Sequence, residues 1–454
     1  MRDYVWKRDR QVTRPDNKQP TSNYQVQPSD LKGRFRLNVP APRKGNHTKA
    51  KSFTNNSSLV SSHPARRTSP ISPLTVLGAP YDPFDAYMLR LGPESRRLIH
   101  HYYHGCSMSL VAYNIGGREC LTNAREHPAL FHSILYVVSL VYNLDHDPKE
   151  RSGSLFHSIE AFRAINTHLQ KGTFSDMTIA AVALMATKET LDGSFESASA
   201  HLNGLQIMVE SRGGVENLAC RHGKAVLWSD LCYSTVWDRE PRFAPHPTTT
   251  PRYLHMAQTI GDSRLVPEDA FDPKSSVIPI IRFLRNVTHS MNDDADFELR
   301  EFNASQELYD VEYQLQTSKT DTQSMLHTAG AISLSISMHL YLYLVIRGIP
   351  IKSRLVSALV QKLKASIVEE VTERWQAEEN NYIWLLWILF IGFGGSQKGG
   401  ERDWFTRKLK NWRNIHTGRA FDASLDSLLK RVIWHNVWCE DVYKRLSKEL
   451  WPEK

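Results

Sequence analysis

Apolar residues recur at every third or fourth position along most of the chain after about residue 77. The stretch that follows Pro128 is typical, because its apolar residues fall on one face of a helix: Leu130, Ile134, Val137, Val138, Val141 and Leu144. We find no convincing run of alternating apolar and polar residues, which would indicate strands, and no internal repeat. The pattern therefore predicts an all-α fold, arranged as one large, bundle-like helical domain.

The limits of the expected helices coincide with residues that favour helix ends. Proline suits a first helical turn, Ser175 can cap the helix that follows it, and the pair Gly213 and Gly214 can end another. We predict helices from Pro93, Pro128 and Ser175, and over Leu155–Leu169, His201–Val209, Leu218–Arg239, Val277–Met291, Gln306–Gln316, Thr328–Ile346, Ser353–Glu379, Tyr382–Phe393, Asp403–Trp412 and Asp422–Leu450.

Two segments lack the helical period. Residues 1–74 are rich in Pro, Asn, Ser, Lys and Arg, and their low apolar content cannot offset an ordering entropy of roughly 1–2 kcal/mol per residue. We predict that they form a disordered tail in front of a helical domain over residues 75–450. Within that domain, residues 244–274 are rich in Pro and Thr, and we predict a long loop there.

Positive charge is concentrated in the tail. The chain has 56 Lys and Arg against 48 Asp and Glu, but residues 1–70 alone hold 15 Lys and Arg against 4 Asp. A basic tail can contact a polyanion such as nucleic acid, or an acidic partner. The scattered spacing leaves a simply solvated tail equally open. The candidate contacts are Lys7, Arg8, Arg10, Arg34, Arg36, Arg66 and Arg67.

The tail also ends with two Ser-Pro steps, at Ser69 and Ser72, behind the basic pair Arg66 and Arg67. Phosphorylation of these serines would cancel part of the positive charge. A plain proline-punctuated linker explains the same residues and is the favoured interpretation.

The cysteines do not form a metal or disulfide framework. None of the five lies in a C-x-x-C pair, and the closest two, Cys220 and Cys232, are 12 positions apart. A binuclear zinc cluster built on six cysteines needs them at tight spacing, so this sequence contains no such module. We expect a reducing compartment, no metal and no cofactor. His100 and His104 have helical spacing, but without a nearby carboxylate pattern a structural or surface role is favoured.

We predict no export and no membrane association. The first residues are charged, which excludes a secretory signal. The most apolar stretch, from Ile383 to Phe393, is too short to span a bilayer, which requires about 20 residues. We expect it to form a buried core helix instead.

The sequence offers no catalytic constellation. It contains no G-x-S-x-G motif, and the glycine-rich run from Gly392 to Ser396 follows an apolar helix and not a strand, which indicates a helix-ending turn. Tryptophan is abundant in the last third, where core packing is favoured over a ligand pocket. We therefore expect that the protein is not an enzyme. An enzymatic function would require a pocket in which ionisable groups are clustered.

Several short motifs follow one another between about residues 77 and 450, and their residues include Asp82, Pro83, Phe84, His201, Gly204, Arg212, Gly213, Gly214, Trp228, Pro241, Trp387 and Trp434. Taken together, these motifs resemble the fungal-specific transcription factor domain, the helical regulatory region usually found after a zinc cluster. The similarity depends on the order and spacing of the motifs more than on any single motif. The resemblance implies a structural role for the residues named above.

The resemblance implies a nuclear regulator or co-regulator of transcription without a zinc cluster. Expected partners are proteins of the transcription machinery, nucleic acid bound non-specifically by the tail, a small-molecule effector, or a second copy of the chain. The alternative is a cytoplasmic helical interaction protein outside transcription. The segment from Met1 to Arg8 also resembles a basic segment of family members that lack the cluster, and residues precede it there. A second hypothesis is therefore that Met1 is internal to a longer product.

Overall fold

The computed structural model describes residues 91–105, 120–146, 154–172, 174–243, 277–293, 305–317, 329–367, 381–416 and 424–451. These residues form helices joined by turns, and none of them belongs to a strand, which confirms the all-α prediction for this part of the chain. The predicted tail over residues 1–74 and the predicted loop over residues 244–274 lie outside the described residues.

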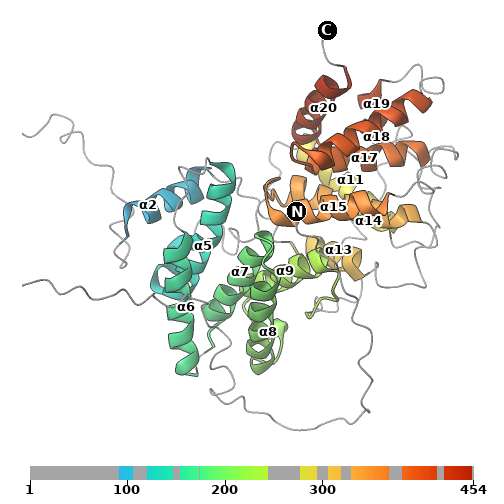
Figure 1. Cartoon of the computed structure of the whole chain (residues 1–454). Helices are drawn as coiled ribbons and strands as arrows, with labels where there is room; N and C mark the ends of the chain where they lie inside the picture. Colours follow the sequence, from blue (N-terminus) through green and yellow to red (C-terminus); the bar gives the residue numbers. More distant parts are fainter. Residues whose placement is uncertain are drawn as a thin grey trace, which may run out of the picture.

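Residues 91–243 make up what we call the N-terminal lobe (Figure 1, blue to green). At its centre α7 packs against α5, α8 and α9, while α6 packs along α5. Small residues such as Ala180, Ala183 and Ala186 let the neighbours of α7 approach closely, and all three are fully buried. The elements are α2 (Pro93–His100), the π-helical turn η2 (His101–Gly105), α4 (Cys120–Asn123), η4 (Ala124–Glu126), α5 (Pro128–Asp145), α6 (Ser154–Gln170), α7 (Asp176–Leu191), α8 (Phe195–Ser211), η6 (Val215–Asn217) and α9 (Cys220–Trp237).

Helix ends in this lobe follow the local signals of the sequence. The Ser175 side chain accepts a hydrogen bond from the Thr178 amide at 3.2 Å and so caps α7. Gly214 has a φ of 114°, and its amide donates to the carbonyl of Val209 at 3.0 Å to close α8. The predictions for these two helices are confirmed.

Residues 277–451 make up what we call the C-terminal lobe (Figure 1, yellow to red). The apolar helix α17 is its centre and packs against α14, α15, α18, α19 and α20. The elements are α11 (Val277–Asp293), α13 (Gln306–Thr317), α14 (Ala329–Tyr341), the π-helical turn η7 (Leu342–Ile346), α15 (Arg354–Ser366), α17 (Asn381–Gly395), α18 (Gly400–His416), α19 (Leu425–Lys430) and α20 (Asn436–Leu450).

The glycine-rich end of α17 permits close helix packing. A Cβ atom on Gly392 would lie 2.2 Å from the ring of Phe405 in α18, and one on Gly394 would lie 2.5 Å from Trp438 in α20. The helix ends at Gly395, within the predicted helix-ending run but two residues beyond the predicted last residue, Phe393. In the described part of the chain, no helix combines the length and the apolar character that crossing a membrane would need.

The prediction of one helix over Asp422–Leu450 is wrong. The helix breaks between α19 and α20, where three consecutive backbone carbonyls bond to side chains from other helices. Arg285 donates to the carbonyl of Val432 at 2.9 Å, Trp387 to that of Ile433 at 3.0 Å, and Asn292 to that of Trp434 at 2.8 Å. These tertiary hydrogen bonds replace the helical ones, and a single-sequence pattern does not contain them.

The helix predicted over Ser353–Glu379 also ends early, at Ser366. Ile367 leaves the helix with a ψ of 77° and buries its side chain in the core. The Ser366 hydroxyl donates to the carbonyl of Leu363 at 2.8 Å, which satisfies one of the last carbonyls of the helix. Residues 368–379 of the predicted helix lie outside the described residues.

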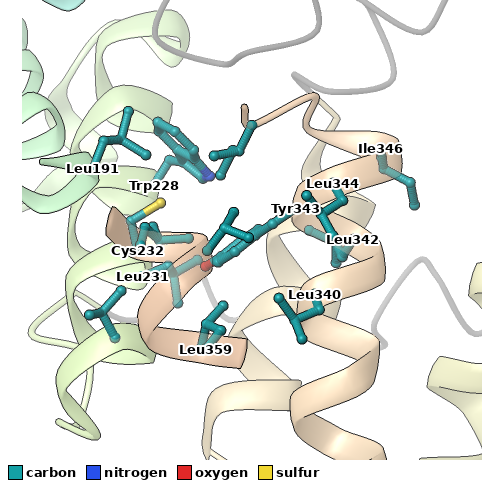
Figure 2. Packing of buried hydrophobic residues seen from close by; sticks show 14 of the residues in the cluster. Leu191, Trp228, Leu231, Cys232, Leu340, Leu342, Tyr343, Leu344, Ile346 and Leu359 are labelled. Atoms are coloured by element: carbon teal, nitrogen blue, oxygen red, sulfur yellow. The ribbon is translucent and has the colours of Figure 1, made fainter. Parts of the chain in front are cut away.

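The two lobes share one continuous hydrophobic core. Figure 2 shows Tyr343 of η7 and Leu359 of α15 facing Trp228, Leu231 and Cys232 of α9. The Tyr343 hydroxyl donates to Thr235 at 3.3 Å across this boundary. Apolar packing between α9 and the C-terminal lobe therefore joins the two lobes.

A fully buried ion pair lies at the same boundary. Arg347, directly after η7, donates through Nε to Glu312 of α13 at 2.7 Å. Its guanidinium lies over the rings of Tyr309 and Trp228, at 5.1 and 5.9 Å from their centroids. Such stacking is energetically favourable for arginine and partly offsets the cost of removing the charge from water.

Candidate functional site

A cleft of about 490 Å³ opens where the two lobes meet, away from the shared core. The ends of α5 and α7 and the start of α6 form one wall, and the residues around the start of α15 form the other. It is lined by Leu140, Asn143, Leu144, His146, Ser154, Lys188, Leu191, Asp192, Lys352, Arg354 and Gln397.

A close backbone approach fixes the width of this cleft. The turn after α7 contains Gly193, whose φ of 78° is unfavourable for other residues. A Cβ atom on Gly193 would lie only 2.9 Å from Cβ of Arg354. The stem of Arg354 therefore packs directly on the turn that carries Asp192, so that α7 and α15 form adjacent edges of the cleft.

On the α7 side, the charge of Lys188 is neutralised. Its ammonium lies 3.0 Å from Asp192 and 3.6 Å from Glu189, and it sits over the ring of Tyr136. Tyr136 donates to Glu189 at 2.7 Å. Burial acts to lower the pKa of Lys188, but the nearby Glu189, Tyr136 and Asp192 raise it overall. Lys188 therefore remains protonated and offsets Asp192.

On the α15 side, two cations line the cleft, and none of the described residues neutralises them. Lys352 and Arg354 are exposed and flank Ser353, whose side chain caps α15 through the Val356 amide at 3.2 Å. Neither forms an ion pair within the described part of the chain, and the first turn of α15 contains no acidic residue. Cations at a helix N-terminus oppose the helix dipole, so this placement costs some stability.

Other side chains complete the rim. The Gln397 amide, after α17, lies 3.5 Å from the carbonyl of Ile351 and 3.4 Å from the hydroxyl of Ser357, which holds it beside α15. The ring of His146 stacks on Tyr142 with 3.9 Å between centroids. With two unneutralised cations, amides and leucine side chains, the cleft has the chemistry to bind an anion.

Histidines are gathered in the interior of the N-terminal lobe. The Nδ1 atoms of His132 and His157 lie 2.9 Å apart, and His157 also contacts the Ser95 hydroxyl at 3.2 Å. Burial lowers the pKa of His132 to about 4 and that of His157 to about 3, so both are neutral near pH 7. Among the described residues, no group of three or more His, Cys, Asp or Glu side chains could hold a metal ion.

The candidate tail contacts Lys7, Arg8, Arg10, Arg34, Arg36, Arg66 and Arg67, the serines Ser69 and Ser72, and the motif residues Asp82, Pro83 and Phe84 lie outside the described residues. The remaining motif residues lie in the two lobes. Their side chains or backbones form contacts within and between helices, and none of these residues lines the cleft.

The motif around Arg212 connects α8, α7 and α9. Arg212 forms an ion pair with Asp176 at 2.7 Å, and the second oxygen of Asp176 accepts from the Ala219 amide at 2.9 Å. Gly213 and Gly214 provide the positive φ angles needed between the two helices. This motif therefore fixes the turn between α8 and α9 against the start of α7.

The motif from Trp228 to Pro241 holds the end of α9. Asp230, which is fully buried, accepts hydrogen bonds from the amides of Arg242 and Phe243, the latter at 3.0 Å, and pairs with the Arg242 guanidinium at 3.2 Å. Burial raises the pKa of Asp230, while the Arg242 and Phe243 contacts act to lower it. The chain is thereby folded back on α9 beyond Pro241.

His201 and Gly204 are buried on α8, where the ring of His201 lies beside Phe162 with centroids 5.5 Å apart. Trp387 bonds to the break between α19 and α20, and Trp434 stacks on Phe390. Trp384 and Trp387 are fully buried, which supports core packing for these tryptophans.

Sequence reasoning missed the cleft. Its lining residues come from five separate segments and share no motif. One local signal was available, because two cations flank the capping serine in Lys352-Ser353-Arg354 at the start of an amphipathic helix that has no acidic first turn.

Comparison with known proteins places the described helices in a family. Residues 97–419 match the fungal specific transcription factor domain. No curated protein and no solved structure matches the chain significantly. The match covers more than half of the chain and includes the cleft, most of the N-terminal lobe and the C-terminal lobe up to α18, and the family is one of regulatory domains. The chain therefore belongs to the fungal specific transcription factor domain family.

Proposed function

We propose that this protein is a nuclear transcription regulator or co-regulator whose helical body binds other proteins of the transcription machinery. The observation that carries the proposal is the family match over residues 97–419, which extends from α2 to just beyond α18. The sequence has no closely spaced cysteines for a zinc cluster, so we propose that promoter contact comes through partners and through the basic tail.

We propose different functions for the helical body, residues 75–450, and for the basic tail, residues 1–74. Residues 75–450 would act as one domain, since the described lobes share a continuous core. Residues 1–74 would contact nucleic acid non-specifically through their excess of Lys and Arg. Contacts of this kind release counterions and weaken steeply as salt is raised.

Chromatin immunoprecipitation of the tagged protein, with and without residues 1–74, tests this proposal. Enrichment at a set of promoters is expected for the full chain. Enrichment that persists without the tail supports recruitment through the body, and enrichment that disappears assigns the contact to the tail.

A tail variant with Arg34, Arg36, Arg66 and Arg67 changed to Gln is the matched control, because it keeps the length and removes charge. Absence of enrichment in every form, together with a cytoplasmic tagged protein in microscopy, would overturn the proposal. It would favour a helical interaction protein outside transcription.

A further inference from the structure

We propose that the cleft between the lobes is a binding site for a small organic dianion, with Lys352 and Arg354 as the anion-binding residues. The ligand would carry two carboxylate or phosphate groups on a short hydrocarbon frame. This inference deepens the proposed function. Ligand binding itself is independent of that function, and only a role of the ligand in regulating transcription rests on it.

The balance of charge in the cleft supports an anionic ligand. Asp192 is the only carboxylate among the described lining residues, and it shares the Lys188 ammonium, 3.0 Å away, with Glu189, which lies 3.6 Å from that ammonium. Lys352 and Arg354 then leave a net positive charge on the opposite wall. Two cations in a recess attract a dianion more strongly than either does on open surface, because the protein walls reduce screening by water.

The geometry of the cationic wall is also held in place. The stem of Arg354 packs on Gly193, and Ser353 anchors the backbone between the two cations by capping α15. The planar guanidinium can donate two parallel hydrogen bonds to one carboxylate or phosphate, while Lys352 serves as a point charge for the second group. Less rotamer freedom is therefore lost when a ligand binds.

The size and the remaining lining residues favour a small organic molecule over a polymer. A volume of about 490 Å³ lies within the range of small-molecule sites. The partly exposed Leu144 supplies an apolar contact for the hydrocarbon frame, and the buried Leu140 and Leu191 lie behind it in the lining. Gln397 can exchange its long contacts of 3.4 and 3.5 Å for a bond to the ligand.

A ligand in this cleft would bridge the lobes, since α5 and α7 belong to one and α15 to the other. A ligand that binds only the folded state raises the thermal midpoint, and the rise grows with the logarithm of ligand concentration above the Kd. The ligand would therefore hold α7 and α15 together, at the point where Gly193 and Arg354 already meet.

The test uses the full chain, purified, with succinate and glutarate as dicarboxylate probes and 1,3-propanediol bisphosphate as the phosphate probe. Isothermal titration calorimetry and thermal unfolding at low ionic strength measure affinity and stabilisation. Butyrate, a monoanion, and succinamide, which is neutral, are the reference compounds. Preference for the carboxylates or for the phosphates identifies which head group the site takes.

The informative variant is K352Q/R354Q, which removes both charges and keeps most of each aliphatic stem. The matched control is K444Q/K448Q, with two exposed lysines of α20 that do not line the cleft. We expect saturable binding of at least one dianion, weakened about tenfold or more by K352Q/R354Q and unchanged by the control. Thermal unfolding of each free variant confirms that it is folded.

Two results would overturn the inference: no dianion binds saturably, or K352Q/R354Q and K444Q/K448Q bind with equal affinity. Either result leaves chromatin enrichment of the full chain untouched, so failure of the site is distinguishable from failure of the proposed function. Conversely, binding without any chromatin enrichment would retain the site and remove its role in transcription.

Discussion

The N-terminal and C-terminal lobes are both helical, but different interactions define their helices. In the N-terminal lobe, local residues such as the capping Ser175 and the pair Gly213 and Gly214 set where helices start and stop. In the C-terminal lobe, the break between α19 and α20 is defined by side chains from remote helices, among them Arg285 and Trp387. Local signals can be found in a sequence, whereas remote ones require the fold.

Two buried polar pairs, one of charged groups and one of neutral histidines, allow a second comparison. The C-terminal lobe contributes a buried ion pair, Arg347 with Glu312, to the shared core. The N-terminal lobe buries the neutral histidines His132 and His157. A charge pair resists changes of pH but fails when one partner is removed, whereas neutral histidines fail when they must take up protons.

The largest effect is expected from Arg347→Met, which leaves Glu312 buried without its cation. Removing one partner of a buried pair costs about 3–5 kcal/mol, and urea denaturation should show this loss in the free energy of unfolding. Burial already raises the pKa of Glu312, and Arg347 opposes that rise, so Glu312 should bind a proton in the variant.

The double variant Arg347→Met with Glu312→Leu is the control for this experiment. It removes both charges and should recover much of the lost free energy. Equal instability of the single and the double variant would indicate that stacking on Trp228 and Tyr309, and not the charge, stabilises the boundary between the lobes.

The histidines should make the N-terminal lobe sensitive to acid. Because the pKa values of His132 and His157 in the folded protein, about 4 and 3, lie below the ordinary value of about 6.5, the unfolded chain binds more protons below pH 6.5. The free energy of unfolding should therefore fall as pH decreases from about 6.5, by about 2 kcal/mol per histidine at pH 5.

Urea denaturation at a series of pH values measures this slope. His157→Gln can still hydrogen-bond to Ser95 but cannot take up a proton, so its curve should be flatter below pH 6.5. The exposed His100 offers a matched substitution, His100→Gln, that should leave the slope unchanged. Identical slopes in the wild type and His157→Gln would mean that this pair does not titrate on unfolding.

The close packing of α17 predicts the next effect. Gly392→Ala places a Cβ atom 2.2 Å from Phe405, so α18 must shift. Overpacking of this kind costs about 1–3 kcal/mol, measured as a lower urea midpoint. Gly400→Ala, at the start of α18, is the control because no atom lies within 4 Å of its added methyl group. A stable Gly392→Ala variant would show that the packing of α17 on α18 can relax.

The fold class, and most helices of both lobes, could be predicted because apolar periodicity and end signals are local. The pairing of Asp230 with Arg242 was not predicted, because it depends on how the chain turns after Pro241. The cleft could not be predicted, since Lys188 and Arg354 become neighbours only when α7 and α15 pack together. No spacing rule connects residues that are 166 positions apart in the chain.

The smallest effect concerns the two serine caps, one in each lobe. Ser353→Ala should lower the free energy of unfolding by about 1 kcal/mol, because it removes the hydrogen bond that the Ser353 hydroxyl accepts from the Val356 amide. Ser175→Ala should cost somewhat more, since Ser175 also contacts Thr178 and His127 through their side chains.

Hydrogen exchange at the first amides of α15 and α7 distinguishes the effects of Ser353→Ala and Ser175→Ala. Ser353→Ala should accelerate exchange only at the start of α15, beside Lys352 and Arg354. Ser175→Ala should accelerate exchange at the start of α7 and also near His127, which precedes α5. If Ser353→Ala instead accelerated exchange at the Gly193 turn, the caps would not be local, and the start of α15 would control the contact between the lobes.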